Sequence, residues 1–380
     1  MSGAPQQGLS IATILLSFAF YLSLAVGGIG LGEELSFARL ATSGPLLIAA
    51  AFLLSLPKKL SLQGIFAVYL VLLYCIIQLM RAEDLTLALR KLDGFIVGGM
   101  LVYLFGSLGV QRGENRFYRS FILVALLTLL LTISYKFVFG FWDRQVRFLL
   151  NGPIVFGWMM LISSLVSLHV AQGHRKFLFL LFSAIFVTAL LWTGSKGPII
   201  GWIAGVSCIF YSQGRLTKFP IFVVTVIFLI VFLYEYNLIP ERFQVFERLL
   251  AGNLLTSDFG SIGIRQLMIF DAWQLFEDHL VFGLGLGNWG SKSNLSIYFG
   301  EGIVYPHNIF AELLSEHGLV GFIILSTVFV IAFQRSSDLG RAIFAAMFIS
   351  LLFTGDMGYW HFLVALPLSM SSSSDEEVGP

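Results

Sequence analysis

The stretch RSFILVALLTLLLTISYKFVFG, residues 119–140, decides the fold, because it is almost entirely apolar and long enough to cross a bilayer as a helix. The whole chain has the same character, since 57% of its 380 residues are hydrophobic and only 12% are charged. A soluble domain carries about 25% charged residues, so this chain could not cover its surface with polar groups in water. The composition predicts an integral membrane protein, and the net charge of +1 gives no indication of nucleic-acid binding.

Similar apolar runs recur along the chain and predict about twelve transmembrane helices. Helices are expected because every backbone polar group inside a bilayer must be satisfied within its own segment. The fold class is therefore all-α, with one polytopic membrane domain over residues 1–370 and a polar tail, residues 371–380, that is disordered or an added remnant. The predicted spans are 9–30, 38–56, 62–80, 93–110, 119–140, 153–172, 176–193, 197–213, 217–236, 318–334, 340–354 and 358–371.

The loops between these runs predict the orientation. One set of loops is rich in lysine and arginine, and basic loops stay on the cytoplasmic side of a membrane. The alternate loops are richer in acidic residues, so they face outward and both chain termini are expected inside. The basic set is Lys58, Lys59, Arg112, Arg116, Arg119, Arg175, Lys176, Arg215, Lys218, Arg335 and Arg341, and the acidic set is Glu33, Glu34, Glu83, Asp84 and Asp143.

Residues 237–306, between the ninth and tenth predicted spans, form one long outer connection, and connections of this length are usually functional. Within it, 241–252 and 261–279 have apolar residues at helical spacing and predict amphipathic helices at the membrane interface. In the second helix, one side is expected to carry Ile264, Leu267, Trp273 and Phe276. The glycine-rich VFGLGLGNWG, residues 281–290, predicts a tight turn back to the membrane, since no strand precedes it as in a nucleotide-binding loop.

Several basic residues at the outer face have two possible roles. Lys196, beside Ser195 in LLWTGSKGPIIGW (190–202), either marks a helix end or binds an anion together with the helix N-terminus. Arg265 either meets lipid phosphate at the interface or grips a diphosphate with its forked guanidinium. Weaker candidates of the same kind are Arg144 and Arg147, whereas Arg81, Arg90 and Lys91 are expected to be solvated loop residues.

The segment YPHNIFAELLSEHGLVG, residues 305–321, places polar side chains directly against an apolar span. Pro306 suits a helix start and Asn308 a helix cap. The capping residue shares one helical stripe with Glu312 and Glu316. His307 is either a capping histidine or a general base, because histidine titrates near neutrality. Two other histidines are expected at less telling places: His317 in a turn and His361 at the outer edge.

The spacing from His307 and Asn308 to Gly318 and Gly321 resembles the signature of the O-antigen ligase and polymerase superfamily of bacterial envelope glycosyltransferases. Three further stretches resemble the same family. The region before the family's histidine resembles GIRQLMIFDAWQLFEDHLVFGLGLGNWG, residues 263–290. The family's T-G-S-R-G turn resembles TGSKGP, in which Lys196 replaces the arginine. The family's N-P stretch resembles RFLLNGPIVFGWMM, residues 147–160. The resemblance covers residues 144–321, and the first 140 residues match only in hydropathy.

This resemblance implies a GT-C-type membrane glycosyltransferase of the bacterial inner membrane, with its active site facing the periplasm and neither metal nor cofactor. It implies a glycan donor linked to undecaprenyl diphosphate and a lipid A–core acceptor. The base would be His307, and the diphosphate would be held by Arg265 and Lys196, with Arg147 as a further cation. Secondary candidates are Asn308, Glu312, Glu316, Arg144 and Ser195.

An O-antigen ligase is the function that these motifs favour. A polymerase with the same donor is the nearest alternative, and an oligosaccharyltransferase acting on a protein hydroxyl is a third. A lipid-linked glycan transporter is disfavoured. Transporters place ionisable groups near the bilayer midplane and often have two similar halves. In this sequence the predicted spans are almost free of charge, and no two halves resemble each other.

Overall fold

The computed structural model describes residues 10–26, 62–141, 152–171, 176–214, 261–295, 305–355 and 357–370. This part of the chain is helical throughout and contains no strand, which confirms the all-α class. Its α-helices are α1 (Ile11–Val26), α3 (Leu62–Leu79), α4 (Leu85–Asp93), α5 (Leu101–Gln111), α6 (Glu114–Phe139), α7 (Pro153–Val170), α8 (Lys176–Trp192), α9 (Lys196–Ser212), α12 (Ser261–Asp278), α13 (Trp289–Lys292), α15 (Ile309–Arg335), α16 (Asp338–Thr354) and α17 (Ala365–Ser369). A π-helical segment, η1 (Gly94–Met100), joins α4 to α5, and a 3₁₀ segment, η4 (Met357–Phe362), precedes α17.

Three of the described helices, α6, α7 and α15, are long and apolar enough to cross a membrane. Shorter apolar helices accompany them, at Ile11–Leu24, Phe66–Leu79, Gly98–Gln111 and Lys176–Trp192. The predicted spans at 38–56 and 217–236 lie outside the described residues, as do the helix at 241–252 and the tail at 371–380. The count of twelve spans therefore stays a prediction.

The last predicted span, 358–371, is not one continuous helix. It consists of the six-residue η4 and the five-residue α17. At 1.5 Å per residue a five-residue helix is only about 7.5 Å long, so α17 alone cannot cross a bilayer. Its residues are apolar because they are buried in the protein: Trp360, Phe362 and Leu366 are all fully buried.

Helix α7 lies in the interior and is apolar on all sides, as expected of a helix surrounded by others. Beside it, α9 and α16 pack closely because α9 presents glycines to its neighbour. A Cβ atom at Gly201 would lie 2.3 Å from the Ala346 carbonyl oxygen, and one at Gly205 would lie 3.0 Å from that of Ala342. Small residues allow such close approach between membrane helices. This pairing is antiparallel, so the first turn of α9 and the last turn of α16 lie at the same end.

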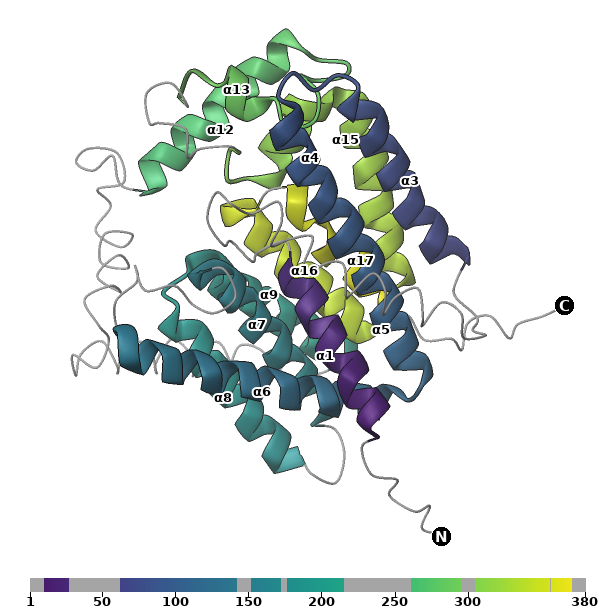
Figure 1. The fold of residues 1–380 in the computed structure, drawn as a ribbon, viewed down its shortest axis with the longest axis vertical. Coiled ribbons are helices and arrows are strands. Elements are labelled where there is room, and N and C mark those ends of the chain that lie inside the picture. The colour runs from purple at the N-terminus through teal and green to yellow at the C-terminus, as the bar shows by residue number, and fades with distance from the viewer. Residues whose placement is uncertain are drawn as a thin grey trace, which may run out of the picture.

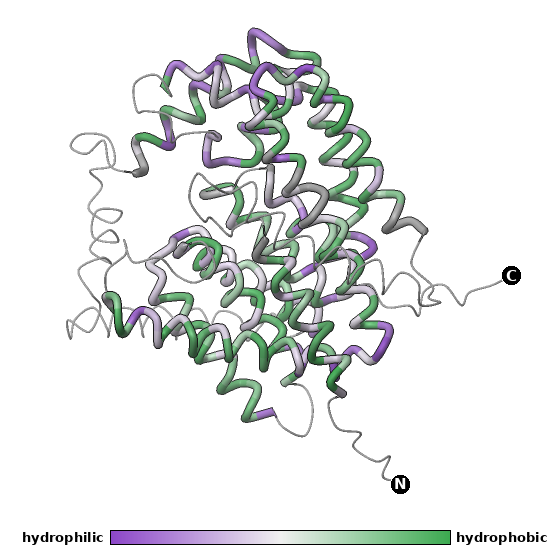
Figure 2. The backbone as a smooth tube through the Cα atoms, viewed as in Figure 1, coloured by the Kyte–Doolittle hydropathy of each residue, from purple (hydrophilic) through white to green (hydrophobic). Residues whose placement is uncertain are grey.

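Above the bundle, α12 and α13 cover one end, together with the start of α4 and the first turns of α15 (Figure 1). Hydrophilic residues gather over this end, whereas hydrophobic residues dominate the helices beneath it (Figure 2). Helices α3 and α15 run side by side and antiparallel, because Tyr74 lies against Gly321 and Phe66 lines a pocket together with Val328.

Candidate functional site

Helix α15 begins where the sequence predicts a cap. The side-chain oxygen of Asn308 accepts hydrogen bonds from the backbone N–H groups of Phe310 (2.9 Å) and Ala311 (3.0 Å). These N–H groups have no acceptor within the helix, so the cap stabilises the helix start. The amide nitrogen of Asn308 also donates to the Leu352 carbonyl (2.9 Å), which ties the start of α15 to the end of α16. The cap prediction is confirmed.

His307 immediately precedes this cap in an unusual backbone conformation. Its φ of 55° lies in the left-handed region, where a non-glycine residue is strained and such strain often occurs at functional positions. The ring packs against Tyr305 with 4.4 Å between centroids. Burial, together with the positive charge of Arg265, lowers the pKa of His307 from 6.5 to about 4. The imidazole is therefore neutral at neutral pH and can accept a proton.

Arg265, on α12, reaches the same place as Asn308. Its Nη1 donates to the Phe353 carbonyl at 2.9 Å, one residue beyond the carbonyl that Asn308 uses. Both carbonyls belong to the last turn of α16, whose C=O groups have no partner within the helix. A guanidinium there is also favoured by the helix dipole. The end of α16 thus brings Arg265 next to His307, although 42 positions separate the two in the sequence numbering.

Lys196 is the first residue of α9, as predicted, after the short turn formed by Thr193, Gly194 and Ser195. The Thr193 hydroxyl accepts from the Ser195 backbone N–H (3.1 Å) and donates to the Leu190 carbonyl (2.7 Å), and Gly194 supplies a φ of 62°. The buried Ser195 hydroxyl makes no hydrogen bond within the described part of the chain. Since α9 and α16 are antiparallel, Lys196 lies at the end of α16 that Arg265 contacts. We call this end the His307 end.

The two glutamates of the predicted stripe are fully buried and form ion pairs with Lys91 of α4. The Lys91 ammonium lies 2.7 Å from Glu316 Oε1 and also contacts Glu312 Oε1. The expectation that Lys91 is a solvated loop residue is therefore wrong. Both carboxylates face α4, so neither is presented to solvent. A buried charge needs a partner of this kind because desolvation is costly.

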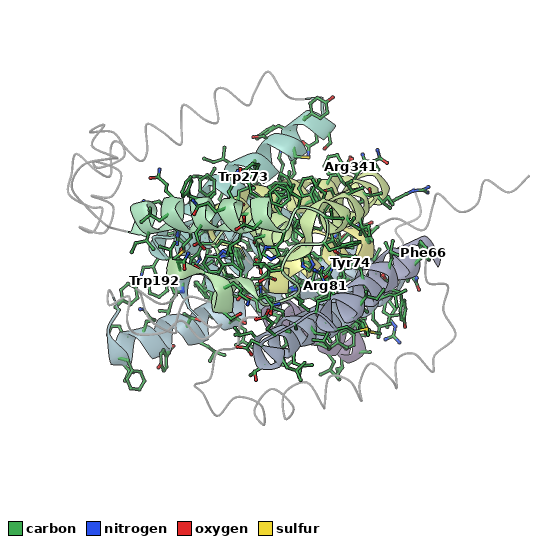
Figure 3. The ribbon with its side chains drawn as sticks, turned by 90° about the horizontal axis from the view of Figure 1, so that it is seen from above. Phe66, Tyr74, Arg81, Trp192, Trp273 and Arg341 are labelled. Atoms are coloured by element: carbon green, nitrogen blue, oxygen red, sulfur yellow. The ribbon has the colours of Figure 1, made fainter. Side chains whose placement is uncertain are left out.

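The glycine-rich turn folds directly onto these glutamates. Glu316 Oε2 accepts from the Gly287 N–H (2.9 Å), and the Glu316 backbone carbonyl accepts from the Gly285 N–H (2.8 Å). Arg81 holds the other side of the turn, donating to the carbonyls of Phe282 (2.6 Å) and Gly283 (2.9 Å). Arg81 therefore anchors the turn, which corrects its prediction as loop solvation. Figure 3 looks down on this end and shows Arg81 together with Tyr74.

The glycines of the histidine–glycine signature serve this packing. Gly318 has a φ of 63° within α15, and a Cβ there would lie 2.5 Å from the Val281 carbonyl oxygen. Conversely, a Cβ at Gly283 would lie 2.4 Å from the backbone of Glu316. A Cβ at Gly321 would lie 2.1 Å from the Tyr74 hydroxyl. At Gly283 and Gly318 an added Cβ would meet backbone atoms, so the glycine-rich turn packs directly against α15.

His317 and His361 are both buried. His317 lies beside Tyr74 with 5.5 Å between ring centroids, directly before the break at Gly318, as its predicted turn requires. His361 is fully buried and its Nε2 lies 3.3 Å from the Leu24 carbonyl oxygen. His361 is thus enclosed by protein, and its predicted place at the outer edge of the membrane stays a prediction.

Helix α12 is present at 261–278, but the four apolar residues predicted to share one side do not share it. Met268 and Ala272 are buried beside Trp289, whereas Leu267 is 39% and Trp273 49% exposed. Successive residues of a helix are rotated by about 100°, which places Trp273, nine positions after Ile264, on the opposite side of the helix. The predicted stripe therefore could not form a single face.

Lys136 is a cation that the sequence analysis did not single out. It is fully buried in the last turns of α6, and its ammonium lies 5.9 Å from the ring centroid of Trp192, four residues before Lys196. Its position inside the otherwise apolar run at 119–140 is the feature of the sequence that could have identified it as a buried cation. The described residues contain no group of three or more His, Cys, Asp or Glu side chains able to hold a metal. Arg144 and Arg147 lie outside the described residues, and so does the Arg90 side chain.

Fold and site together define an all-helical membrane protein that holds a neutral histidine beside an arginine at one end of its bundle. Residues 179–326 match the model of the O-antigen ligase family. This match confirms the resemblance to the O-antigen ligase superfamily and supports a glycosyl-transferring enzyme. The matched segment includes Lys196, Arg265 and His307, and it begins after the RFLLNGPIVFGWMM stretch. No curated protein matches the chain.

Proposed function

We propose that this protein is an O-antigen ligase, which transfers polysaccharide from undecaprenyl diphosphate to a hydroxyl of the lipid A–core oligosaccharide on the periplasmic face. The observation that carries the proposal is the meeting of His307 and Arg265 at the last turn of α16, at the end where α9 begins with Lys196. The family match supports the same chemistry. Under this proposal the fold is of the GT-C type, and both termini lie in the cytoplasm.

The reaction needs one base and a binding site for an anionic leaving group. His307 takes the proton of the acceptor hydroxyl while the hydroxyl oxygen forms a bond to the anomeric carbon of the donor sugar. The bond from that carbon to the diphosphate oxygen breaks, and its electron pair leaves with the diphosphate. Direct attack of this kind inverts the anomeric configuration. The neutral state of His307 supports its role as the proton acceptor.

Fixed cations stabilise the charge that develops on the departing diphosphate. Arg265 offers a planar fork that can bind two oxygens at once, and its place is fixed by the Phe353 carbonyl. Lys196 contributes a point charge, supplemented by the N–H groups of the first turn of α9 and by the positive end of its dipole. Arg147 remains a further proposed cation of the same site.

The role of the positive charge of Lys196 is tested with one variant that keeps the charge and one that removes it. Lys196→Arg is expected to retain transfer activity, because it keeps a cation at the start of α9. Lys196→Ala is expected to lose most of it. The rate of transfer from purified lipid-linked donor measures both. An alanine variant as active as the parent protein would exclude an anion-binding role for this lysine.

A polymerase with the same donor is the alternative that the family match also supports, since only the acceptor differs. The buried charges of Lys91, Glu312 and Glu316 do not favour a transporter, because they pair with one another and hold the glycine-rich turn. An oligosaccharyltransferase that acts on protein is supported by no contact within the described residues.

Deletion of the gene followed by lipopolysaccharide gel electrophoresis distinguishes ligase from polymerase. Loss of a ligase leaves bare lipid A–core, while lipid-linked polymer accumulates. Loss of a polymerase leaves core that carries a single repeat unit. Unchanged lipopolysaccharide would contradict both functions. Activity of the purified protein with lipid-linked donor is expected to be insensitive to EDTA, and inhibition would point to a metal.

A further inference from the structure

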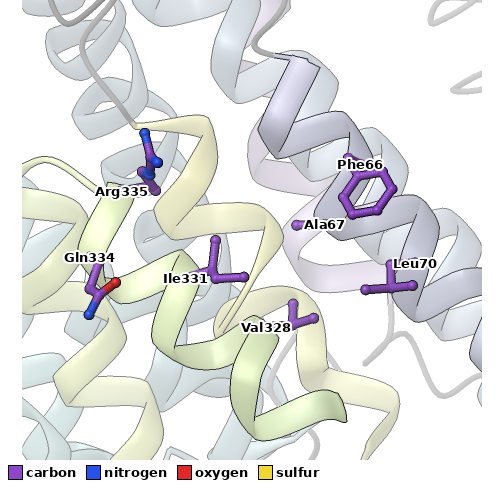
Figure 4. Close-up of a pocket in the computed structure, with 7 residues that line it drawn as sticks. All are labelled: Phe66, Ala67, Leu70, Val328, Ile331, Gln334 and Arg335. Atoms are coloured by element: carbon purple, nitrogen blue, oxygen red, sulfur yellow. The ribbon is translucent and has the colours of Figure 1, made fainter.

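A pocket of about 410 Å³ lies between α3 and α15, away from the proposed catalytic site. Figure 4 shows the two helices facing each other across it. The α3 side is wholly apolar, and the α15 side changes from apolar to polar toward the end of the helix. The lining residues are Phe66, Ala67, Leu70, Val328, Ile331, Gln334 and Arg335.

This pocket is remote from the His307 end. Arg335 is the last residue of α15, and His307 precedes its first. The segment of α15 from Leu319 to Arg335 alone spans about 25 Å at 1.5 Å per residue. A headgroup bound at Arg335 is therefore on the opposite side of the bundle from Arg265. The pocket cannot hold the diphosphate of a donor whose sugar meets His307.

The polar end of the pocket carries the positive charge of Arg335. Arg335 is exposed, and neither its side chain nor that of Gln334 makes a hydrogen bond or ion pair within the described residues. Arg341, a few residues further on, differs. Its guanidinium donates to the carbonyls of Phe333 (3.3 Å) and Gln334 (3.1 Å) and lies 3.5 Å from an oxygen of Asp338.

We propose that this pocket binds an anionic phospholipid, with one acyl chain between α3 and α15 and the headgroup phosphate on Arg335. Two observations fit this occupant. The apolar walls suit a hydrocarbon chain, since Phe66 is 66% and Ile331 37% exposed on helices that face lipid. The positive charge that Arg335 places among the lining residues suits a phosphate. Arg335 also belongs to the loops predicted to be cytoplasmic, and the cytoplasmic leaflet of membranes is rich in anionic lipid.

The proposal is tested with the purified full-length protein in detergent, to which phosphatidylglycerol is added. Native mass spectrometry measures bound lipid, and the shift in Tm measures its effect. We expect the parent protein to retain one phosphatidylglycerol. Arg335→Gln should weaken its binding by about fivefold, the effect of one basic residue near a membrane surface. Ile331→Trp, which fills the pocket, should remove it, and Arg341→Gln should bind as the parent does.

Three results would overturn the proposal. The first is equal phosphatidylglycerol binding by the parent, Arg335→Gln and Ile331→Trp proteins. The second is equal loss from Arg335→Gln and Arg341→Gln, which would indicate a general charge effect. The third is displacement of the phospholipid by an isoprenyl phosphate at equal concentration, which would assign the pocket to an isoprenoid carrier. Because Arg335 is exposed, the Arg335→Gln protein is expected to fold. If the Ile331→Trp protein does not fold, the comparison of Arg335→Gln with Arg341→Gln still decides the question.

Discussion

The two parts of α15, before and after Gly318, have the same helical backbone but opposite surroundings. Before Gly318, the helix buries Glu312, Ser315, Glu316 and His317 completely. After Gly318 the helix is largely apolar, and side chains such as Ile323 are 61% exposed, as expected of a surface that meets lipid. The first part is held by specific side-chain contacts. The second part is held by packing, after the backbone N–H groups of Leu319 and Val320 have donated to the carbonyls of Leu280 and Val281.

This difference explains what polar residues beside a membrane span achieve here. Each polar contact of the first part fixes a position: the glutamates fix Lys91 and the glycine-rich turn, and Asn308 fixes the end of α16. A lipid-facing helix can rotate or slide by small amounts at little cost, whereas a buried ion pair cannot. The polar side chains near the His307 end therefore fix the positions of the helices and of the glycine-rich turn that they contact.

The largest effect is expected at the start of the polar part. His307→Ala should lower glycan transfer by about 10²–10⁴-fold, because general-base catalysis contributes this much. The rate of transfer from purified lipid-linked donor is the measurement. His279→Ala is the matched control, since that histidine lies exposed at the end of α12, and it should retain activity. Undiminished transfer by a folded His307→Ala protein would remove the base from the proposed mechanism.

A test of stability compares two lysines that form ion pairs. Lys91→Met leaves two buried carboxylates without their cation and should cost about 3–5 kcal/mol. Lys292→Met removes an exposed ion pair with Glu83, of 2.7 Å, and should cost less than about 1 kcal/mol. Thermal unfolding in detergent, followed by circular dichroism, measures both. Equal destabilisation would mean that the polar part of α15 is not specifically held.

The boundary between the two parts can be tested with a pair of glycines of matched conformation. Gly318 and Gly214 both have a φ of 63°, but only Gly318 has neighbours within reach of an added Cβ. Gly214→Ala should therefore cost only the backbone strain of about 1–2 kcal/mol. Gly318→Ala should lower Tm further, because it displaces the glycine-rich turn. Similar Tm values for the two variants would show that the close approach does not contribute.

The smallest expected effect concerns pH. Burial and Arg265 lower the pKa of His307 from 6.5 to about 4, so the ring stays neutral as pH falls from 7 to 5. If His307 is the base, kcat/KM should change little over that range and fall as pH passes through about 4. The measurement is the pH profile of kcat/KM. A fall centred between pH 6 and 7 would indicate a histidine in ordinary surroundings.

The sequence predicted the features that depend on neighbouring residues. The Asn308 cap, the start of α9 at Lys196 and the glycine turn each follow from local backbone preferences, and each is present. The partners of Glu312 and Glu316 could not be predicted in this way, because Lys91 lies more than 200 positions away. The last span was misjudged because hydropathy does not distinguish burial in lipid from burial in protein.

The candidate site also combines features that local sequence predicts with features that depend on distant residues. The resemblance identified His307 and Arg265, but their meeting depends on the last turn of α16, which no motif marks. The α12 face was predicted incorrectly because apolar residues were chosen without regard to their rotation about the helix axis. Long-range packing therefore decides what local sequence leaves open.

The last turn of α16 has a mechanical consequence. Its carbonyls at Leu352 and Phe353 anchor Asn308, which adjoins His307, and Arg265 at successive positions. Asn308 and Arg265 therefore depend on one and the same turn, so a substitution that distorts it would displace both side chains together. Because α9 packs closely against α16, the start of α9 at Lys196 is held at this end by the same helix.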